Sequence, residues 1–425
     1  MKDLNPELNE ELKKKEQIKE AILPVMYDYK DKRDSVLPES EEGLREKLRL
    51  IKENAINDIE SLKKRAIFNL EKNGIIVIEA KDAIAAGKEI RKIIGNENLV
   101  IKAKSNTANE INLKEILKDK ELVETDLGDF IIQISEEDDL HPVLPSFHIP
   151  PEKIAEVINK KYKKDIKAMP EDIVAFARTF LREKIEKAKI GITGANVISA
   201  DGSVFILENE GNISLVSRLP DKHIILASFD KIVNTREDAL HIVKSAAIYG
   251  TGQSYPAYVN IISSPSKTAD IQNKMINGAQ GAKEVYLILI DNGRSEILNS
   301  EFKELLYCIN CGACINFCPV YHQITTRYGS GTFPGARGVL SSFFTQGKEK
   351  SFENGAFFCT TCKMCKENCP AKIDLSDLIK RLRERLTEDG IEPENIKEML
   401  KNTKQYKNPF GKVEEGKIPK KLYCC

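Results

Sequence analysis

Residues 308–319 have the sequence CINCGACINFCP, and residues 359–370 have the sequence CTTCKMCKENCP. Each stretch follows the pattern C-x2-C-x2-C-x3-C-P, a spacing that binds [4Fe–4S] clusters. Three cysteines at i, i+3 and i+6 share a tight loop, which can wrap one face of a cube and bring backbone N–H groups toward its sulfides. The two runs hold eight of the chain's ten cysteines. The sequence therefore predicts two [4Fe–4S] clusters.

The fourth cysteine of each run stands directly before a proline, and such a cysteine commonly ligates the cluster of the other run. We therefore expect each cluster to draw on both runs. The predicted ligands of the first cluster are Cys308, Cys311, Cys314 and Cys369. The predicted ligands of the second cluster are Cys359, Cys362, Cys365 and Cys318.

Zinc sites and disulfides are the ordinary alternatives for grouped cysteines. Zinc ribbons pair C-x2-C units across longer gaps and supply only four ligands per ion, so a crowded C-x2-C-x2-C triplet fits them poorly. Disulfides are typical of secreted chains, and the opening MKDLNPELNE lacks the apolar core of a signal peptide. The iron–sulfur interpretation is preferred on both counts.

The composition limits the class of protein. A length of 425 residues predicts two or three domains. Charged residues make up 31% of the chain and the net charge is zero, so no nucleic-acid or acidic-membrane partner is predicted. The longest apolar runs, such as Val285 to Ile290, have the length of a strand and not of a membrane span. We expect a cytoplasmic protein without membrane insertion.

Residues 1–70 show apolar residues at helical spacing, divided by Pro24 and Pro38, and predict at least two helices without chemistry of their own. From about Gly74, strands alternate with helices, which indicates βαβ units and a parallel sheet. Strands are expected at 121–125 and 130–135, a three-stranded meander over 191–219, and helices beginning at 151 and 170 and spanning 236–249. The α/β region should close near residue 293.

Four motifs allow a comparison with a known family. They are GITGAN at 191–196, NEGN at 209–212, RLPDKHI at 218–224 and IDNGR at 290–294. Residues from about 65 to 295 resemble the LUD domain, and together with the cysteine runs the chain resembles iron–sulfur B subunits of lactate-utilisation complexes. The resemblance implies an α/β LUD domain, related to ribose-phosphate isomerases and CoA transferases, followed by a mainly α-helical ferredoxin domain with two [4Fe–4S] clusters.

The expected domains follow from these assignments. They are an N-terminal helical segment (1–70), the LUD domain (71–295), the helical ferredoxin domain (296–390) and a C-terminal tail (391–425). Forty residues separate Cys318 from Cys359, enough for one or two helices, which is similar to the iron–sulfur subunits of succinate dehydrogenase and heterodisulfide reductase. A further helix should follow the clusters and stop at Gly390, because leucines and isoleucines line one face from Leu375 to Leu386. The NPFG stretch at 408–411 resembles a motif of heterodisulfide-reductase and glycolate-oxidase iron–sulfur proteins.

Several polar residues are weaker site candidates. A ligand cleft could be formed by residues in and beside two glycine-containing turns, where the backbone can approach a ligand closely. These residues are Thr193, Asn196, Glu210 and Asn212. Turn chemistry alone explains them equally well. His148 could bind a substrate acid there, although His141 and His148 lie in a proline-rich segment that is better explained as a structural loop.

Two other features have ordinary explanations. The glycine-rich stretch from Tyr328 to Gly338 matches no phosphate-binding pattern, and we expect a loop beside the first cluster. Cys424 and Cys425 are adjacent and therefore poorly spaced for a shared ligand set, so we expect exposed thiols.

No residue set supports acid–base or nucleophilic catalysis as strongly as the cysteines support clusters, and no dinucleotide fingerprint is present. The sequence predicts a non-catalytic electron-transfer subunit that passes single electrons between a partner dehydrogenase and an acceptor. The family resemblance implies that the electrons come from L-lactate or a related 2-hydroxy acid, oxidised with companion subunits. Two alternatives stay open: a component of a heterodisulfide-reductase-like complex, and a LUD-domain enzyme or ligand-binding protein with structural or redox-sensing clusters.

Overall fold

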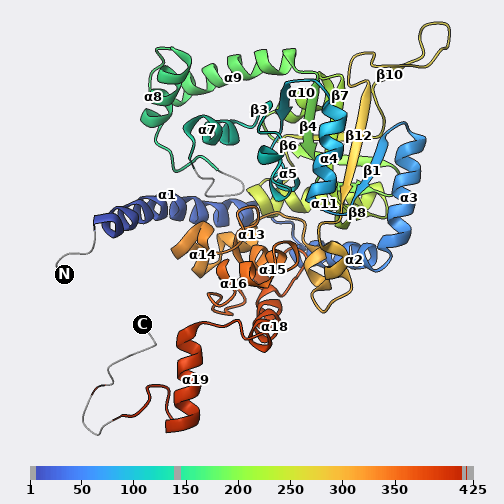
Figure 1. The fold of residues 1–425 in the computed structure, drawn as a ribbon. Helices are drawn as coiled ribbons and strands as arrows, with labels where there is room; N and C mark the ends of the chain where they lie inside the picture. Colours follow the sequence, from blue (N-terminus) through green and yellow to red (C-terminus); the bar gives the residue numbers. More distant parts are fainter. Residues whose placement is uncertain (1–5, 138–144, 414–417, 419–425) are drawn as a thin grey trace.

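The structure is a computed structural model that describes residues 6–137, 145–413 and 418. His141, Cys424 and Cys425 lie outside the described residues. Three helices open the chain (Figure 1). They are α1 (Pro6–Val36), α2 (Glu41–Asn57) and α3 (Ile59–Lys72). The prediction of at least two helices is confirmed. Pro24 lies inside α1 without ending it, because the following turns bury Met26 and Tyr29 against the rest of the protein.

The LUD region is built on a six-stranded parallel sheet in the order β1-β12-β7-β4-β2-β3. Its strands are β1 (Ile76–Ala80), β2 (Leu99–Lys102), β3 (Glu121–Glu124), β4 (Ile190–Gly194), β7 (Lys222–Ser228) and β12 (Glu284–Ile290). In β7, Ile224 and Leu226 belong to a core shared with α4 (Ala83–Ile94), whereas Ile225 and Ala227 belong to the larger core on the other face. Burial of both faces explains why these strands are continuous apolar runs.

The strand order contains one reversal of direction. The chain moves outward from β2 to the edge strand β3, returns to β4 on the other side of β2, and then continues to β7 and β12. In open parallel sheets, ligands bind outside the carboxyl ends of the strands at such a reversal. This sheet therefore favours a ligand site where β2 and β4 end.

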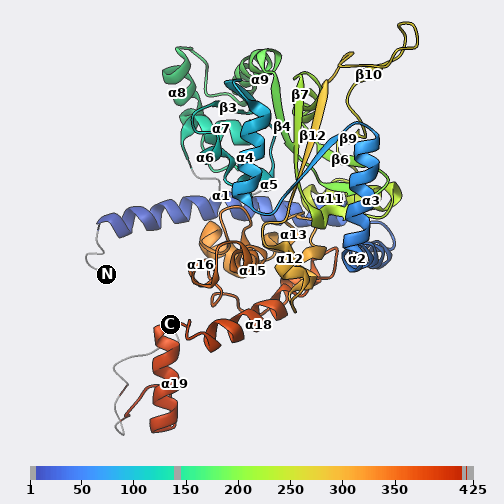
Figure 2. The same ribbon diagram turned by 45° about the vertical axis from the view of Figure 1, so that its right-hand side comes forward.

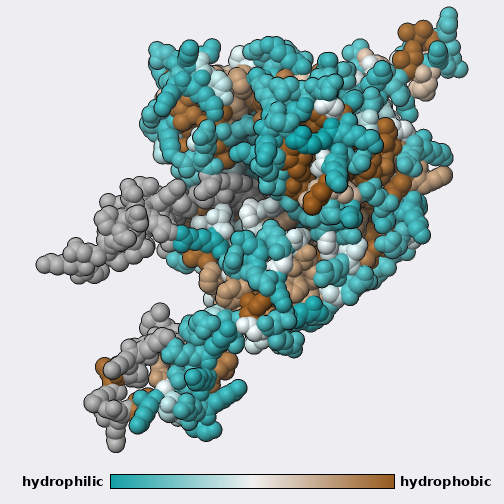
Figure 3. All heavy atoms as spheres, in the orientation of Figure 1, coloured by the Kyte–Doolittle hydropathy of each residue, from teal (hydrophilic) through white to brown (hydrophobic). Residues whose placement is uncertain are grey.

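A second sheet of four strands has the order β8-β5-β6-β9. Its strands are β5 (Val197–Ser199), β6 (Ser203–Glu208), β8 (Ile232–Val233) and β9 (Tyr258–Ile262). Strands β10 (Lys267–Thr268) and β11 (Ile276–Asn277) form a hairpin that projects from the body in Figure 1. The segment between them exposes Ile271 and Met275, and Figure 3 shows apolar side chains at its tip on an otherwise mostly hydrophilic face.

Further helices connect these strands. They are α5 (Asn106–Glu110), α6 (Leu113–Ile116), α7 (Leu127–Ser135), α8 (Pro151–Tyr162), α9 (Pro170–Lys187), α10 (Asn212–Arg218), α11 (Arg236–Thr251) and α12 (Arg294–Leu298). The predicted starts at Pro151 and Pro170 are confirmed, with each proline in the first turn, where its missing N–H costs nothing. The predicted helix from Arg236 is confirmed as α11.

Two strand predictions are wrong. Residues 130–135 belong to the helix α7, because Asp126 caps it by accepting a hydrogen bond from the backbone N–H of Asp129, and Phe130, Ile131 and Ile134 share its buried face. The last strand of the expected meander is the helix α10, whose Ser214 N–H is held by the Glu208 carboxylate. The expected meander is thus divided: β4 joins the large sheet, and β5 and β6 form a hairpin in the small one.

The cysteine runs lie in a helical region beneath the LUD sheets, with α1 running along the boundary (Figures 1 and 2). Its helices are α13 (Ala313–Asn316), α14 (Pro319–Ile324), α15 (Gly335–Thr345), α16 (Lys348–Glu353), α17 (Met364–Glu367) and α18 (Leu375–Glu388). The one or two helices predicted between the runs are present as α15 and α16, and α14 precedes them directly after Cys318. The predicted apolar face of α18 is confirmed too, since all five of its predicted leucines and isoleucines are buried.

One continuous core joins the three regions. It includes Met26 of α1, Ile225 of β7 and Leu382 of α18. Farther along the chain, α19 (Glu394–Tyr406) buries none of its residues. None of the helices in the described ranges is long and apolar enough to cross a membrane.

Candidate iron–sulfur centres and an adjoining cleft

Both cysteine runs have the same local backbone. Asn310 and Thr361, two residues after the first cysteine of each run, have left-handed φ values of 57° and 56°. The N–H of each donates to the sulfur of that first cysteine, Cys308 or Cys359, at 3.4 Å. Each loop thus supplies an amide donor to a sulfur, which is what a thiolate ligand of a cluster requires.

A second pair of left-handed residues starts a short helix in each run. Gly312 (φ 84°) precedes α13, and Lys363 (φ 66°) precedes α17. Glycine adopts this conformation freely, whereas lysine is strained in it. The repeated geometry therefore reflects the demand of the loop on the backbone and not the preference of each residue.

The fourth cysteine of each run lies with the triplet of the other run. Burial raises the pKa of Cys369 to about 11, and the nearby Cys308 adds to this rise. Burial, followed by the charges of Cys308 and Cys369, also raises the pKa of Cys311. We call Cys308, Cys311, Cys314 and Cys369 the inner set.

The opposite exchange occurs around the second triplet. Burial raises the pKa of Cys318, with Cys359 and Cys362 contributing. Burial likewise raises the pKa of Cys365 to about 12, with contributions from Cys359 and Cys318. We call Cys359, Cys362, Cys365 and Cys318 the outer set. Cys314 of the inner set lies near Cys365 and lines the same cavity as the outer set, so the two sets adjoin and the ligands of each cluster stay a prediction.

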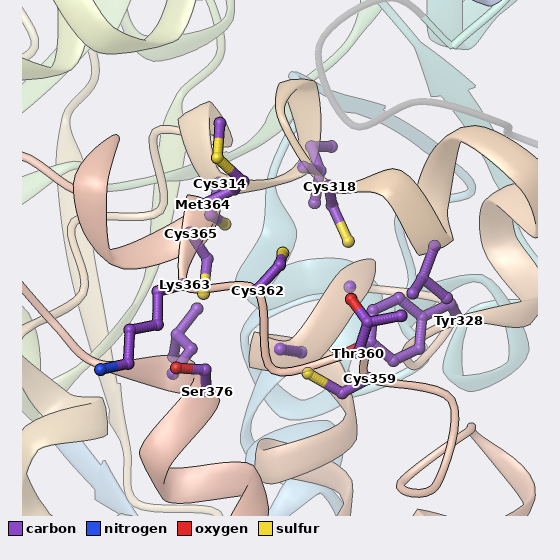
Figure 4. A pocket seen from close by; sticks show the side chains of 15 residues that line it. Cys314, Cys318, Tyr328, Cys359, Thr360, Cys362, Lys363, Met364, Cys365 and Ser376 are labelled. Atoms are coloured by element: carbon purple, nitrogen blue, oxygen red, sulfur yellow. The ribbon is translucent and has the colours of Figure 1, made fainter.

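The outer set lines a cavity with an empty volume of about 400 Å³ (Figure 4). Cys314 of the inner set lines the same cavity, together with mostly apolar residues that include Tyr328, Met364 and Leu375. Among the described residues, no three histidine, cysteine or acidic side chains converge closely enough to hold a single metal ion. Four thiols set around a larger space, with an N–H donor to one sulfur, fit a multi-iron cluster better than one zinc ion.

Helices α1 and α2 bring cations to the inner set. Arg45 donates from Nε and Nη2 to the carbonyl oxygen of Cys369 at 3.2 and 3.1 Å. Arg33 donates to Asn368 Oδ1 at 2.7 Å and lies 4.8 Å from the ring centroid of Phe317. The N-terminal segment, for which no chemistry was expected, therefore borders the cluster region.

Lys52 is a third cation on this side. Its buried amine donates to the backbone oxygen of Asp230. Burial lowers the pKa of Lys52, while Asp230 and Cys308 oppose this change. A sequence signal existed: Arg45, Arg49 and Lys52 recur at helical spacing on the apolar face that contains the buried Leu48.

A cleft with an empty volume of about 1270 Å³ opens where β2 and β4 end. It is lined by residues that follow the strands, among them Lys104, Asp126, Asn196 and Lys231, and by Ile309 and Asn310 from the first cysteine run. The cleft therefore lies at the reversal of strand order and reaches the loop of the inner set. Sequence reasoning missed Ile309 and Asn310 because it treated the two domains separately, and it missed Lys104 and Lys231 because it placed the cleft only at the glycine-containing turns.

The predicted cleft residues are divided by the fold. Asn196, Glu210 and Asn212 line the cleft. Thr193 is fully buried and forms a 2.8 Å hydrogen bond with His223 instead. His148 lies against Phe147, away from the lining residues.

Two ionisable groups of the cleft are perturbed. Burial and the neighbouring Asp126 raise the pKa of Glu210 to about 7, although the backbone N–H of Leu127 donates to it at 3.1 Å. Burial lowers the pKa of Lys231 to about 8, and its amine donates to the carbonyl oxygen of Ala195. The cleft therefore contains two neighbouring carboxyl groups, Asp126 and Glu210, as well as the amine of Lys231.

The IDNGR motif holds the floor beneath the cleft. Arg294 donates to both oxygens of Glu110 and to Asp230 Oδ1, each at 2.7 Å, and Asn292 donates to Glu110 at 2.7 Å. All the charged side chains of this group are buried. Burial disfavours the Glu110 carboxylate, but Arg294 outweighs this effect, and the pKa of Glu110 is lowered. The motif is therefore structural.

Comparison with known proteins agrees with both halves of this architecture. Residues 63–290 match the LUD domain, and residues 304–373 match the 4Fe-4S dicluster domain. A DUF162 family protein from Deinococcus radiodurans covers 55% of this chain and 98% of its own length, at 13% identity and a TM-score of 0.30, which is too remote to support an argument.

Curated relatives extend over most of the chain. Lactate utilization protein B of Bacillus subtilis is 35% identical over 75% of this chain and 66% of its own length. Its counterpart in Bacillus velezensis is 33% identical over 80% and 70%, and an uncharacterised electron transport protein of Escherichia coli is 31% identical over 82% and 73%. The chain spans about two thirds of the length of the relatives it matches. With a LUD domain followed by a 4Fe-4S dicluster domain, the chain belongs to the lactate utilization protein B family of electron-transport iron–sulfur proteins.

Proposed function

We propose that this chain is the electron-transfer subunit of an oxidoreductase complex that oxidises L-lactate or a related 2-hydroxy acid. The observation that supports the proposal is the proximity of the two cysteine runs, since Cys308 contributes to the raised pKa of Cys369 and Cys359 to that of Cys318. Support for the substrate class comes from the relatives, which are named for lactate utilization and electron transport. A partner subunit carries out the oxidation, and this chain accepts the electrons.

The inner set, in this proposal, ligates one [4Fe–4S] cluster and the outer set the other. Each cluster, when bound, supplies reversible one-electron redox chemistry. The residues around them set the potential: Asn310 and Thr361 donate backbone N–H groups to sulfur, and Arg45 brings a positive charge to the backbone of Cys369. Donors and cations near a cluster favour its reduced, more negative form.

The surroundings of the two sets indicate which of them a partner protein can approach. Cys362 of the outer set is exposed, and Phe358 and Met364 beside it are exposed by 51% and 39%. Exposed apolar side chains next to a redox centre suit transient docking of an electron partner. We assign the outer set to exchange with an acceptor or donor protein.

The first test is the metal content of protein purified without oxygen. We expect about eight irons per chain, as two four-iron clusters. Both clusters should be reduced by dithionite and reoxidised without loss of iron. Four irons per chain, zinc in place of iron, or clusters that lose iron on reduction would each contradict electron transfer through two cubes.

The second test addresses the substrate. The chain should be purified anaerobically from its native host together with bound proteins, and the clusters followed by EPR after addition of L-lactate. Reduction should require the companion subunits, because the proposal assigns the oxidation of the hydroxy acid to a partner subunit. Reduction by a dithiol donor, and not by 2-hydroxy acids, would favour a heterodisulfide-reductase-like complex instead.

A further inference from the structure

The cleft beside the inner set has the construction of a ligand site. Its walls come from the segments after β2 and β4, on either side of the reversal of strand order, where open parallel sheets bind small molecules. Lys104 follows β2, Asn196 follows β4, and Lys231 follows β7. Independent loops therefore converge on one cavity.

The hydrogen-bond donors of the cleft have capacity left for a ligand. Asn196 Oδ1 accepts from the backbone N–H of Leu207 at 2.9 Å, and Asn209 Oδ1 accepts from that of Ala257 at 3.1 Å. These bonds orient each amide, and neither Nδ2 donates to another group in the part of the chain that the structure describes. The Lys231 amine uses one of its three N–H groups on the carbonyl of Ala195.

The carboxylates of the cleft are tied to the backbone or to neighbouring side chains, although within the described ranges Asp126 and Glu210 each accept on one oxygen only. Glu208 accepts from Asn260 Nδ2 at 2.7 Å and from the N–H of Ser214 at 3.0 Å. Asp126 accepts from the N–H of Asp129 at 3.2 Å, and Glu210 accepts from that of Leu127 at 3.1 Å. The donors left on Asn196, Asn209 and Lys231 favour a ligand that carries acceptor oxygens.

We propose that this cleft binds a small molecule through a carboxylate or phosphate group, held by Lys231, Asn196 and Asn209, and that the bound anion acts on the inner cluster through Asn310. Asn310 lines the cleft, and its N–H donates to the sulfur of Cys308 at 3.4 Å. Its side-chain oxygen also lies 3.6 Å from that sulfur. One residue therefore touches both the ligand space and a predicted cluster ligand.

The direction of the effect follows from charge. A thiolate bound to iron carries no proton and cannot donate to Asn310 Oδ1, so only the bond from the backbone N–H of Asn310 remains. An anion held in the cleft through the Asn310 side chain brings negative charge to this loop, and this charge disfavours the reduced cluster. By linkage, the reduced protein must then bind the anion more weakly than the oxidised protein. The effect of the anion on the inner cluster rests on the proposed cluster assignment, whereas binding of the anion to the cleft does not.

The binding test uses the full chain, purified anaerobically, with inorganic phosphate and succinate as separate probes in calorimetry. Asn196→Asp and Asn209→Asp keep the oxygen that accepts the backbone N–H and replace the free donor with a negative oxygen, so both should fold and weaken binding at least tenfold. Lys189→Met removes a charge outside the cleft and is the matched control, expected to bind normally. The probe that binds identifies the anion class, and failure of both probes, or equal binding by all variants, overturns the site.

The coupling test is an EPR-monitored redox titration with and without the bound probe. We expect the inner cluster alone to shift to lower potential, by about the 59 mV that corresponds to a tenfold preference for the oxidised protein. Asn310→Gly tolerates the left-handed backbone and should bind the probe while losing most of the shift. Binding without any shift overturns the coupling. Iron content, measured on the same samples, separates failure of this inference from failure of the cluster assignment.

Discussion

The inner and outer sets share one backbone design but lie in different surroundings. The inner set is bordered by the cationic helices α1 and α2 and by the LUD domain. Gly250 of α11 packs against the backbone of Cys311, where an added Cβ would lie 3.4 Å from the carbonyl oxygen. The outer set reaches the surface at Cys362. The loop geometry therefore determines which thiols gather, while the surroundings determine their charge, solvent access and neighbours. The two clusters should therefore behave differently although their ligand loops are alike.

Exchange of the fourth cysteines gives the largest predicted effect. Cys318→Ser should remove the outer cluster and leave the inner one, although Cys318 belongs to the first run in sequence. Cys369→Ser should do the reverse. Each variant should hold about four irons, half of the expected total.

EPR of the two variants provides mutual controls, because each should retain the signal that the other loses. Loss of the inner signal in the Cys318 variant would mean that each run holds its own cluster. The two sets would then each consist of the four cysteines of one run.

Removal of an inner cation should have a smaller effect. Arg45→Met takes away a guanidinium that donates to the carbonyl of Cys369 and should lower the potential of the inner cluster by tens of millivolts. A charge about 10 Å away at an effective dielectric constant of about 20 contributes roughly 1.7 kcal/mol, and about 1.4 kcal/mol corresponds to about 59 mV for one electron.

Lys47→Met, an exposed position on the same helix, is the control and should leave both potentials unchanged. The measurement is a redox titration of both clusters. Equal shifts of the two potentials would show that the inner set has no special electrostatic environment.

The smallest effect concerns the LUD domain that encloses the inner set. Burial lowers the pKa of His223 to about 3, so the folded protein keeps this imidazole neutral while an unfolded chain, with a pKa near 6.5, takes up a proton as the pH falls. This stability is present above pH 6.5 and decreases below it. Between pH 7.5 and 5.5 the free energy of unfolding should fall by about 1.4 kcal/mol on this account.

His223→Gln keeps a neutral partner for Thr193 and should remove this part of the pH dependence. Urea unfolding at both pH values, followed by far-ultraviolet circular dichroism, is the measurement, since the chain has no tryptophan. Identical pH dependence in the two proteins would exclude His223 as its source. If the EPR signal of the inner cluster disappears at a lower urea concentration than that of the outer cluster, the stability of the inner cluster depends on the LUD domain.

The spacing of residues in the sequence was sufficient to predict features that depend on near neighbours in the chain. The cysteine runs, the buried strands and the proline-initiated helices could all be predicted from residues a few positions apart. The helices α7 and α10 could not, because their apolar residues suit a strand equally well and the choice depends on the capping of α7 by Asp126 and on the bond between Glu208 and Ser214.

Contacts between domains could not be predicted either. Nothing near Ile309 or Asn310 in the sequence indicates that they complete a cleft of the LUD domain. The sequence shows the basic residues of α2 at helical spacing. It does not show that Arg45 contacts Cys369, which lies far along the chain. The missed part of the site consists of residues whose partners are remote in sequence.

The bond between Arg45 and the carbonyl of Cys369 joins residues 324 positions apart. At 5–20 residues per second, a ribosome needs roughly 16 to 65 s to make the chain between them. During that time α2 exists without the partner that covers its basic face. The contact between α2 and the backbone of Cys369 can therefore form only after the second cysteine run has been made. A nascent chain that stops before the second cysteine run would leave that face uncovered and become a target for chaperones or proteases.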